Sequence, residues 1–195
     1  AAAAFKRGWK LQKRGWDATL VSDNQATEDT LFSLNSPGIL HIATHGFFKQ
    51  QDELVESDMG IRSLSGGNNP LINSGLLFVN GGHSYDKDNG KINGNSEGIF
   101  TALEAQNLKL DNCQLVVLSA CETGQGSVSV GNGVFGLQKS FLDAGANNIL
   151  MTLQKVDDEV TQKLMATFYD KFLDSNNAED ALYEAKLEIK KEYSH

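Results

Sequence analysis

The hydrophobic positions of the chain gather in short continuous runs that alternate with amphipathic stretches. Apolar runs with the length of a buried strand cover residues 39–43, 114–120 and 148–153, and the mixed segment "DATLV" at 17–21 also predicts a short strand. Uninterrupted apolar runs are typical of strands in parallel sheets, which are buried on both faces. Parallel strands need crossover connections, and helical spacing between the runs supplies them. The pattern predicts an α/β fold with a mainly parallel sheet flanked by helices on both faces.

The expected helices carry recognisable signals at their ends. Helical spacing covers residues 26–34, 101–108, 133–145, the stretch from Val156 to Phe172, and a last stretch through Ile189. Thr27, Thr101 and Asn177 stand where an N-cap is expected, because a short polar side chain there accepts a bond from a first-turn N–H. Gly145 stands just after the third helix, where a left-handed residue commonly ends a helix.

Residues 50–98 have a different composition. This stretch is rich in Gly, Asn, Ser and Asp and holds one short apolar island, "GLLFVN" at 75–80. We expect a long excursion from the sheet that contains a hairpin around the island. Connections of this length in a compact domain are usually functional or mobile.

Two of the apolar runs end in residues that carry chemistry. The run at 39–43 leads through Thr44 to His45 and Gly46, and the run at 114–120 leads directly to Cys121. In parallel sheets, ligands bind outside the carboxyl ends of the strands. His45 and Cys121 follow their runs by about the same offset. If the two strands are neighbours, both side chains emerge at the same edge of the sheet.

An imidazole beside a thiol is the arrangement for nucleophilic catalysis by cysteine. The imidazole lowers the pKa of the thiol and later supplies a proton to the leaving group. The backbone N–H groups of Gly46 and Cys121 are candidates for stabilising a developing oxyanion. This chemistry requires neither a metal nor an organic cofactor, and we expect none.

Structural interpretations of these residues stay open as alternatives. Cys121 fits a buried structural thiol, and His45 fits a capping histidine at a strand end. His41 is expected to be a buried strand residue with a hydrogen-bond partner, and Cys113 a packing residue. A zinc site from His41, His45, His83 and a cysteine is a further alternative, although the paired short spacings of structural zinc modules are missing.

Composition narrows the possible partners. The length of 195 residues suits one domain or a domain with a small appendage. The net charge of −8 argues against a broad nucleic-acid surface, since such a surface is basic. No run approaches the ~18 apolar residues of a membrane span, and no signal-peptide pattern is present. Two cysteines that are badly placed to bridge each other indicate reduced thiols and a cytoplasmic setting.

Several blocks of the sequence together resemble a CHAT domain, a caspase-like module. They are "ILHIATHGFF", "NPLINSGLLF", "TALEAQNLKLDNCQLVVLSACETGQG", "GLQKSFLDAGANNILMTL" and "VDDEVTQKLMATFYDKFL". Caspases, separases, gingipains and clostripain share the pair of signatures, an apolar run before His-Gly and another before Ala-Cys. We therefore expect residues 1–23 to be an amino-terminal remnant or linker with the first strand, and residues 24–195 to be the CHAT domain.

The resemblance implies a function. It implies a cysteine-type endopeptidase, a hydrolase of the thiol protease class, with His45 and Cys121 as the dyad. Gly46 and the N–H of Cys121 would form the oxyanion hole. CHAT domains often follow tetratricopeptide repeats in bacteria, and some relatives act in antiviral defence. A protein substrate, a regulatory tetratricopeptide or sensor module, and a longer natural chain are therefore expected. The alternative is a catalytically silent module that keeps the fold and binds a partner protein.

The resemblance also suggests a substrate pocket. In separases, the Asp of a "VxD" segment contacts a basic residue just before the cut, and Asp158 holds the matching place in "LQKVDD". Asp157 and Glu122 are further candidates for this pocket, and the alternative for Glu122 is a solvated or loop-tethering carboxylate. Gln154 stands where relatives often have Trp, which implies a reshaped pocket. The alternative for Asp158 is a carboxylate in the first turn of a helix, where the helix dipole favours it.

Overall fold

The computed structural model describes residues 16–48, 70–81, 98–119, 130–152 and 158–193. The chain divides into two compact units, residues 23–155 and residues 1–22 with 156–195. The larger unit contains, in chain order, η1 (Asp23–Gln25), α3 (Glu28–Phe32), β1 (Ile39–Ile42), β2 (His45–Phe48), α4 (Pro70–Asn73), β3 (Ser74–Leu77), β4 (Ile99–Thr101), α6 (Ala102–Ala105), β5 (Leu115–Leu118), α7 (Val130–Asp143) and β6 (Ile149–Met151). The smaller unit contains α8 (Asp158–Ser175) and α9 (Ala178–Glu192).

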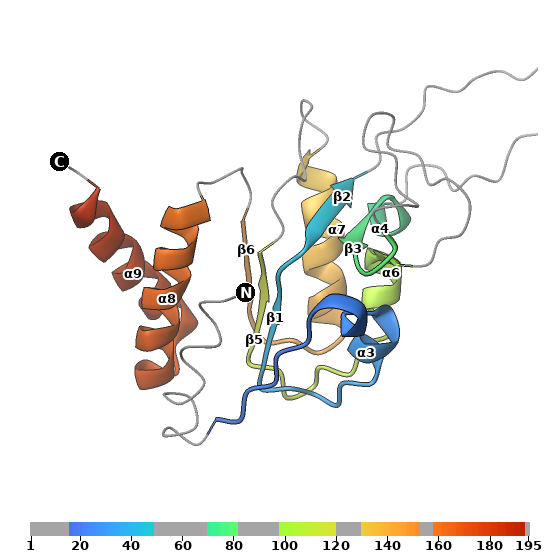
Figure 1. Cartoon of the computed structure of the whole chain (residues 1–195), viewed down its shortest axis with the longest axis horizontal. Coiled ribbons are helices and arrows are strands. Elements are labelled where there is room, and N and C mark those ends of the chain that lie inside the picture. Colours follow the sequence, from blue (N-terminus) through green and yellow to red (C-terminus); the bar gives the residue numbers. More distant parts are fainter. Residues whose placement is uncertain (1–15, 49–69, 82–97, 120–129, 153–157, 194–195) are drawn as a thin grey trace, which may run out of the picture. The chain divides into compact units, whose positions relative to one another are not determined.

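The first sheet is parallel, with the strand order β1-β5-β6. Figure 1 shows these strands side by side with β5 in the middle. β1 pairs with β5 from Ile39↔Leu115 to Ile42↔Leu118. All four residues of β5 are buried, as its uninterrupted apolar run requires. The strands predicted at 39–43, 114–120 and 148–153 are therefore confirmed.

A second sheet, β2-β3-β4, is antiparallel throughout. The prediction of one mainly parallel sheet was therefore incomplete. Only two residues separate the end of β1 from the start of β2, so the sequence pattern indicated one strand where the structure has two. The apolar island predicted at 75–80 supplies part of β3. Phe47, Leu77 and Ile99 form a small core for this sheet, with one residue from each strand.

The strand expected at residues 17–21 is wrong, because residues 16–22 form no strand or helix in the structure. Leu20 is 48% exposed and Val21 is 37% exposed. A strand is stabilised by pairing with a neighbour and by burying one face. With these side chains left in water, the apolar run alone does not hold an extended strand.

One face of the parallel sheet packs into the main core. Alternate residues Leu40, Ile42, Val116 and Leu118 belong to this core, together with Leu137 and Phe141 of α7. α7 also contacts β3 and β6, so one helix reaches both sheets. A helix layer on the opposite face stays a prediction, because the remaining long helices, α8 and α9, belong to the other unit.

The predicted helix caps are confirmed. Thr27 caps α3 by accepting a bond from the backbone N–H of Thr30. Thr101 and Glu104 form a complete capping box at the start of α6. Asn177 caps α9 through the N–H groups of Glu179 and Asp180. These short polar side chains satisfy N–H groups that a helix leaves unpaired in its first turn.

The smaller unit is a pair of antiparallel helices. Lys163 near the start of α8 contacts Glu192 at the end of α9 at 2.8 Å. Lys171, further along α8, lies 3.3 Å from both Glu184 and Glu188. Phe168, Phe172, Ala181, Ala185 and Ile189 are the buried side chains of the pair. In the described part of the chain, no helix combines the length and apolar character that a membrane crossing needs.

Candidate active site

The register of β1 and β5 brings the two chemically interesting strand ends together. Ile42, the last residue of β1, pairs with Leu118, the last residue of β5. The backbone N–H of Ser119 then donates to the carbonyl oxygen of Ile42 over 2.9 Å. The two strands are parallel neighbours, as the sequence-based hypothesis required. β1 and β5 therefore end at the same edge of the sheet. In sequence, His45 follows the end of β1 and Cys121 follows the end of β5.

His45 is the first residue of β2, and its side chain is exposed. Two contacts fix the backbone here. The hydroxyl of Thr44 donates to the carbonyl oxygen of Leu77, and His45 itself pairs with Leu77 across the antiparallel ladder. β3 thereby holds the start of β2 in place, and the imidazole stays accessible to a substrate.

Gly46 is buried in β2 and lies opposite Leu76. The next residue, Phe47, is fully packed at 1% exposure and anchors the strand in its small core. The strand thus fixes the backbone of Gly46 one residue beyond His45. The role of Gly46 in an oxyanion hole stays a prediction, because the other proposed donor, the N–H of Cys121, lies outside the described residues.

A side-chain hydrogen bond joins the two strands just before the expected dyad. Nε2 of His41 lies 3.0 Å from Oγ of Ser119. His41 was expected to have a hydrogen-bond partner, which is confirmed, and to be buried, which is wrong, because its side chain is largely exposed. Neighbouring protein atoms still desolvate the imidazole and lower the pKa of His41. The ring is therefore mostly neutral at pH 7.

Cys113 behaves as the packing residue that the sequence predicted. Its side chain is 0% exposed and belongs to the main core. The thiol donates a weak hydrogen bond to the carbonyl oxygen of Leu115 over 3.4 Å. Burial raises the pKa of this thiol, because a thiolate loses its hydration there. Cys113 therefore lacks the properties of a nucleophile.

Other predicted site residues are only partly described. Asp158 is the first residue of α8, which is the position that the helix-dipole alternative requires. Asp157 and Glu122 lie outside the described residues. Among the residues that the structure covers, no group of three or more His, Cys, Asp and Glu could hold a metal ion. The zinc alternative involves His83, which is also outside that part of the chain, and so it is untested.

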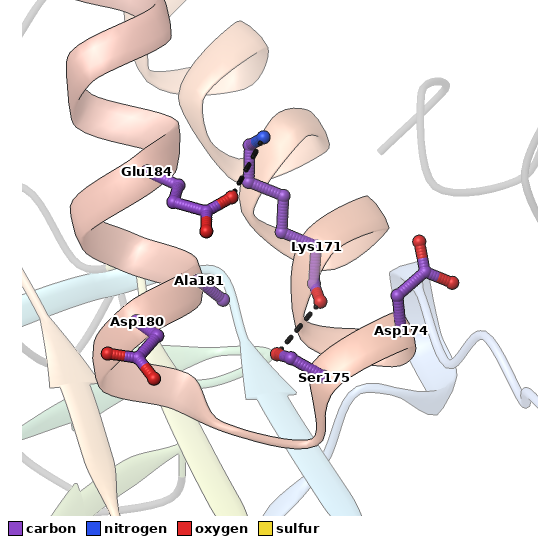
Figure 2. A pocket seen from close by; sticks show the side chains of 6 residues that line it. All are labelled: Lys171, Asp174, Ser175, Asp180, Ala181 and Glu184. Atoms are coloured by element: carbon purple, nitrogen blue, oxygen red, sulfur yellow. Dashed lines mark hydrogen bonds and ion pairs between the residues drawn. The ribbon is translucent and has the colours of Figure 1, made fainter.

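A hollow of about 340 Å³ lies within the α8–α9 pair, and Figure 2 shows the side chains that line it. It is lined by Lys171, Asp174, Ser175, Asp180, Ala181 and Glu184. The ammonium group of Lys171 points toward the carboxylate of Glu184 (Figure 2), and its bonds to Glu184 and Glu188 raise the pKa of Lys171. None of the lining residues is a cysteine or a histidine. Lys171 and Glu184 form an ion pair in this hollow, and the lining contains neither of the residue types expected for the dyad.

Comparison with known proteins agrees with these strand-end signatures. The CHAT domain family model matches residues 6–195. The chain belongs to the CHAT domain family. This is a family of caspase-like cysteine peptidases, and the mixed α/β architecture with its parallel sheet is consistent with such a fold. No curated protein and no solved structure matches this CHAT domain.

Proposed function

We propose that this CHAT domain is a cysteine endopeptidase that cleaves a protein substrate through Cys121 and His45. The observation that carries the proposal is the pairing of Ile42 with Leu118 in neighbouring parallel strands. His45 and Cys121 each follow this pair by three residues. Adjacent strands lie about 4.8 Å apart, so equal short connections from one pair can bring an imidazole and a thiol into contact.

The proposed reaction proceeds through an acyl-enzyme. His45 takes the thiol proton, and the thiolate of Cys121 attacks the peptide carbonyl carbon. The carbonyl π electrons move to oxygen, where the N–H groups of Gly46 and Cys121 stabilise the negative charge. The C–N bond then breaks, and His45 gives its proton to the departing amine. His45 next deprotonates a water molecule, which attacks the thioester, releases the carboxylic acid and restores the thiol.

Labelling with a peptidyl chloromethyl ketone tests this proposal. The wild-type chain should be alkylated at Cys121, and mass spectrometry of the digested protein identifies the modified residue. Cys121→Ala should abolish both labelling and cleavage. His45→Ala should lower both by at least about 10²-fold, the usual scale for the loss of a general base.

Cys113→Ala is the matched control for these variants. It also removes a thiol, but one that is buried in the core, so labelling of Cys121 should continue at the wild-type rate in the folded variant. Cleavage that persists in purified Cys121→Ala would end the peptidase assignment. Labelling that is independent of His45 would instead favour the silent, partner-binding alternative.

Regulation and specificity extend the proposal. CHAT domains are commonly joined to tetratricopeptide repeats, which supports control of this activity by an attached or partner module. Asp158 is proposed to favour a basic residue just before the cut, in line with the resemblance of "LQKVDD" to the separase segment. Asp157 and Glu122 are proposed for the same pocket because they are carboxylates close to Asp158 and Cys121 in sequence.

A further inference from the structure

The hydrogen bond between His41 and Ser119 joins two residues that lie close in sequence to the two members of the proposed dyad. His41 lies four residues before His45, and Ser119 lies two residues before Cys121. Cα pairing places His41 opposite Val117, so the imidazole reaches forward along the sheet to the hydroxyl of Ser119. The bond therefore crosses from β1 to the residue that directly follows β5.

His41 is the polar residue of β1 and occupies the exposed position of the strand, between the buried residues Leu40 and Ile42. A polar side chain suits this position, and here it also bonds to the end of the neighbouring strand. The His41–Ser119 bond is open to water, where solvent competes for both groups, so its contribution to stability is modest. Desolvation also keeps the imidazole mostly neutral. A modest effect on stability and a neutral ring leave the location of the bond, at the ends of the two strands, as the feature that can affect the site.

The place of the bond suggests a role in alignment. On the β1 side, the chain continues through Thr44 to His45, whose backbone is held against β3. On the β5 side, the backbone bond from Ser119 to Ile42 holds one side of Ser119, and the bond to His41 holds its side chain. Together these two bonds fix the residue from which the chain departs toward Cys121.

We propose that His41 and Ser119 form a positioning pair that aligns Cys121 with His45 by tying the end of β5 to β1. This inference rests on the peptidase function proposed above. Nucleophilic catalysis is sensitive to such alignment, because misplacement by about 1 Å can cost 10²-fold in rate. Neither residue touches the reacting atoms in this account.

The test compares rates of Cys121 alkylation by a peptidyl chloromethyl ketone in the full 195-residue chain. Ser119→Ala and His41→Phe each remove the bond and should each slow alkylation about tenfold. The double variant should be no slower than either single variant, because the two changes remove the same interaction. Ser119→Thr keeps the hydroxyl and should retain most of the wild-type rate.

Ser140→Ala is the matched control. Ser140 is a buried serine whose hydroxyl donates to the Gly136 carbonyl oxygen within α7, so this variant loses a comparable bond away from the strand ends. It should alkylate at the wild-type rate. Urea midpoints for all variants should show that Ser119→Ala and His41→Phe remain folded under the assay conditions.

Three results would overturn the positioning pair. They are a wild-type alkylation rate in Ser119→Ala, losses that multiply in the double variant, and an equal loss in Ser140→Ala. If these occur while alkylation of the wild-type chain still depends on His45, the peptidase proposal survives. If the wild-type chain shows no alkylation of Cys121 that depends on His45, both proposals fail.

Discussion

The two cysteines of the chain lie eight residues apart in sequence, on either side of β5. Cys113 precedes β5 and is enclosed by the main core. Cys121 follows β5 by three residues and lies outside the described residues. Because only the thiolate form of cysteine is nucleophilic, a raised thiol pKa protects Cys113 from reaction. Burial in the core thus makes Cys113 a packing residue.

Cys113 should make the fold sensitive to alkaline pH. Its pKa is raised in the folded chain, so above about pH 8.5 the unfolded thiol ionises while the folded thiol stays protonated. The unfolded state then binds fewer protons, and the free energy of unfolding falls as pH rises. The urea midpoint should therefore fall between pH 7 and pH 9.5, and this fall should be larger in Cys121→Ala than in the double variant Cys113→Ala/Cys121→Ala.

The comparison between these two variants cancels the titration of all other groups. Thiol counting with a chromogenic disulfide gives a second check. In native Cys121→Ala, Cys113 should react far more slowly than it does in urea. Equal alkaline losses in both variants, together with rapid native reaction, would contradict the buried assignment of Cys113.

At the scale of single residues, the sequence predicted which residues follow each strand, but not which side chains contact each other across the strands. His45 and Gly46 follow β1, as their apolar run predicted. A hydrogen-bond partner was expected for His41, but its identity as Ser119 was missed, because the two residues are 78 positions apart and meet only through the register of two strands. A serine at the end of an apolar run, two residues before a cysteine, was the only local signal.

At the scale of elements, periodicity predicted long features and missed short ones. α7 and α9 follow helical spacing over many residues, so their existence was clear from sequence. β4 has only three residues, and its last residue, Thr101, also caps α6, so the helix signal concealed the strand. The partners of β2 and β3 are distant in sequence, and antiparallel pairing between them leaves no local pattern.

The antiparallel sheet should be intolerant of a side chain at position 75. A Cβ on Gly75 would clash with the carbonyl oxygen of Phe100 and would lie 2.6 Å from the ring of Phe47. Neither a paired backbone nor a buried ring can move cheaply, so Gly75→Ala should destabilise the chain by about 2 kcal/mol or more. Urea unfolding followed by circular dichroism measures this change.

Asn80→Gly is the control for this prediction. Asn80 follows β3 and has a φ of 69°, a conformation that glycine adopts without strain. Its substitution should change stability by no more than about 0.5 kcal/mol. A Gly75→Ala variant as stable as the wild type would show that β3 does not pack between β2 and β4 as closely as the structure has it.

At the scale of the whole molecule, acidic residues dominate the charge. The chain carries 25 Asp and Glu against 17 Lys and Arg, for a net charge of −8. Such a field attracts basic partners in general, whether or not one carboxylate contacts them. Composition therefore agrees with a basic substrate but does not assign the preference to a residue. Separating a local contact from the overall field requires two carboxylates that differ only in position.

Asp158 and Asp174 provide this pair, because both belong to α8 and lie near its opposite ends. If Asp158 contacts the residue before the cut, Asp158→Asn should lower the preference for Arg over a neutral residue about tenfold, as expected for the loss of a charge-assisted bond. Asp174→Asn should leave the preference unchanged. A peptide library that varies only this residue, read out as kcat/KM, measures both effects.

Equal losses in the two variants that disappear in high salt would assign the preference to the overall field. An unchanged Arg preference in Asp158→Asn, or no preference in the wild type, would leave Asp158 as a carboxylate that stabilises the start of α8.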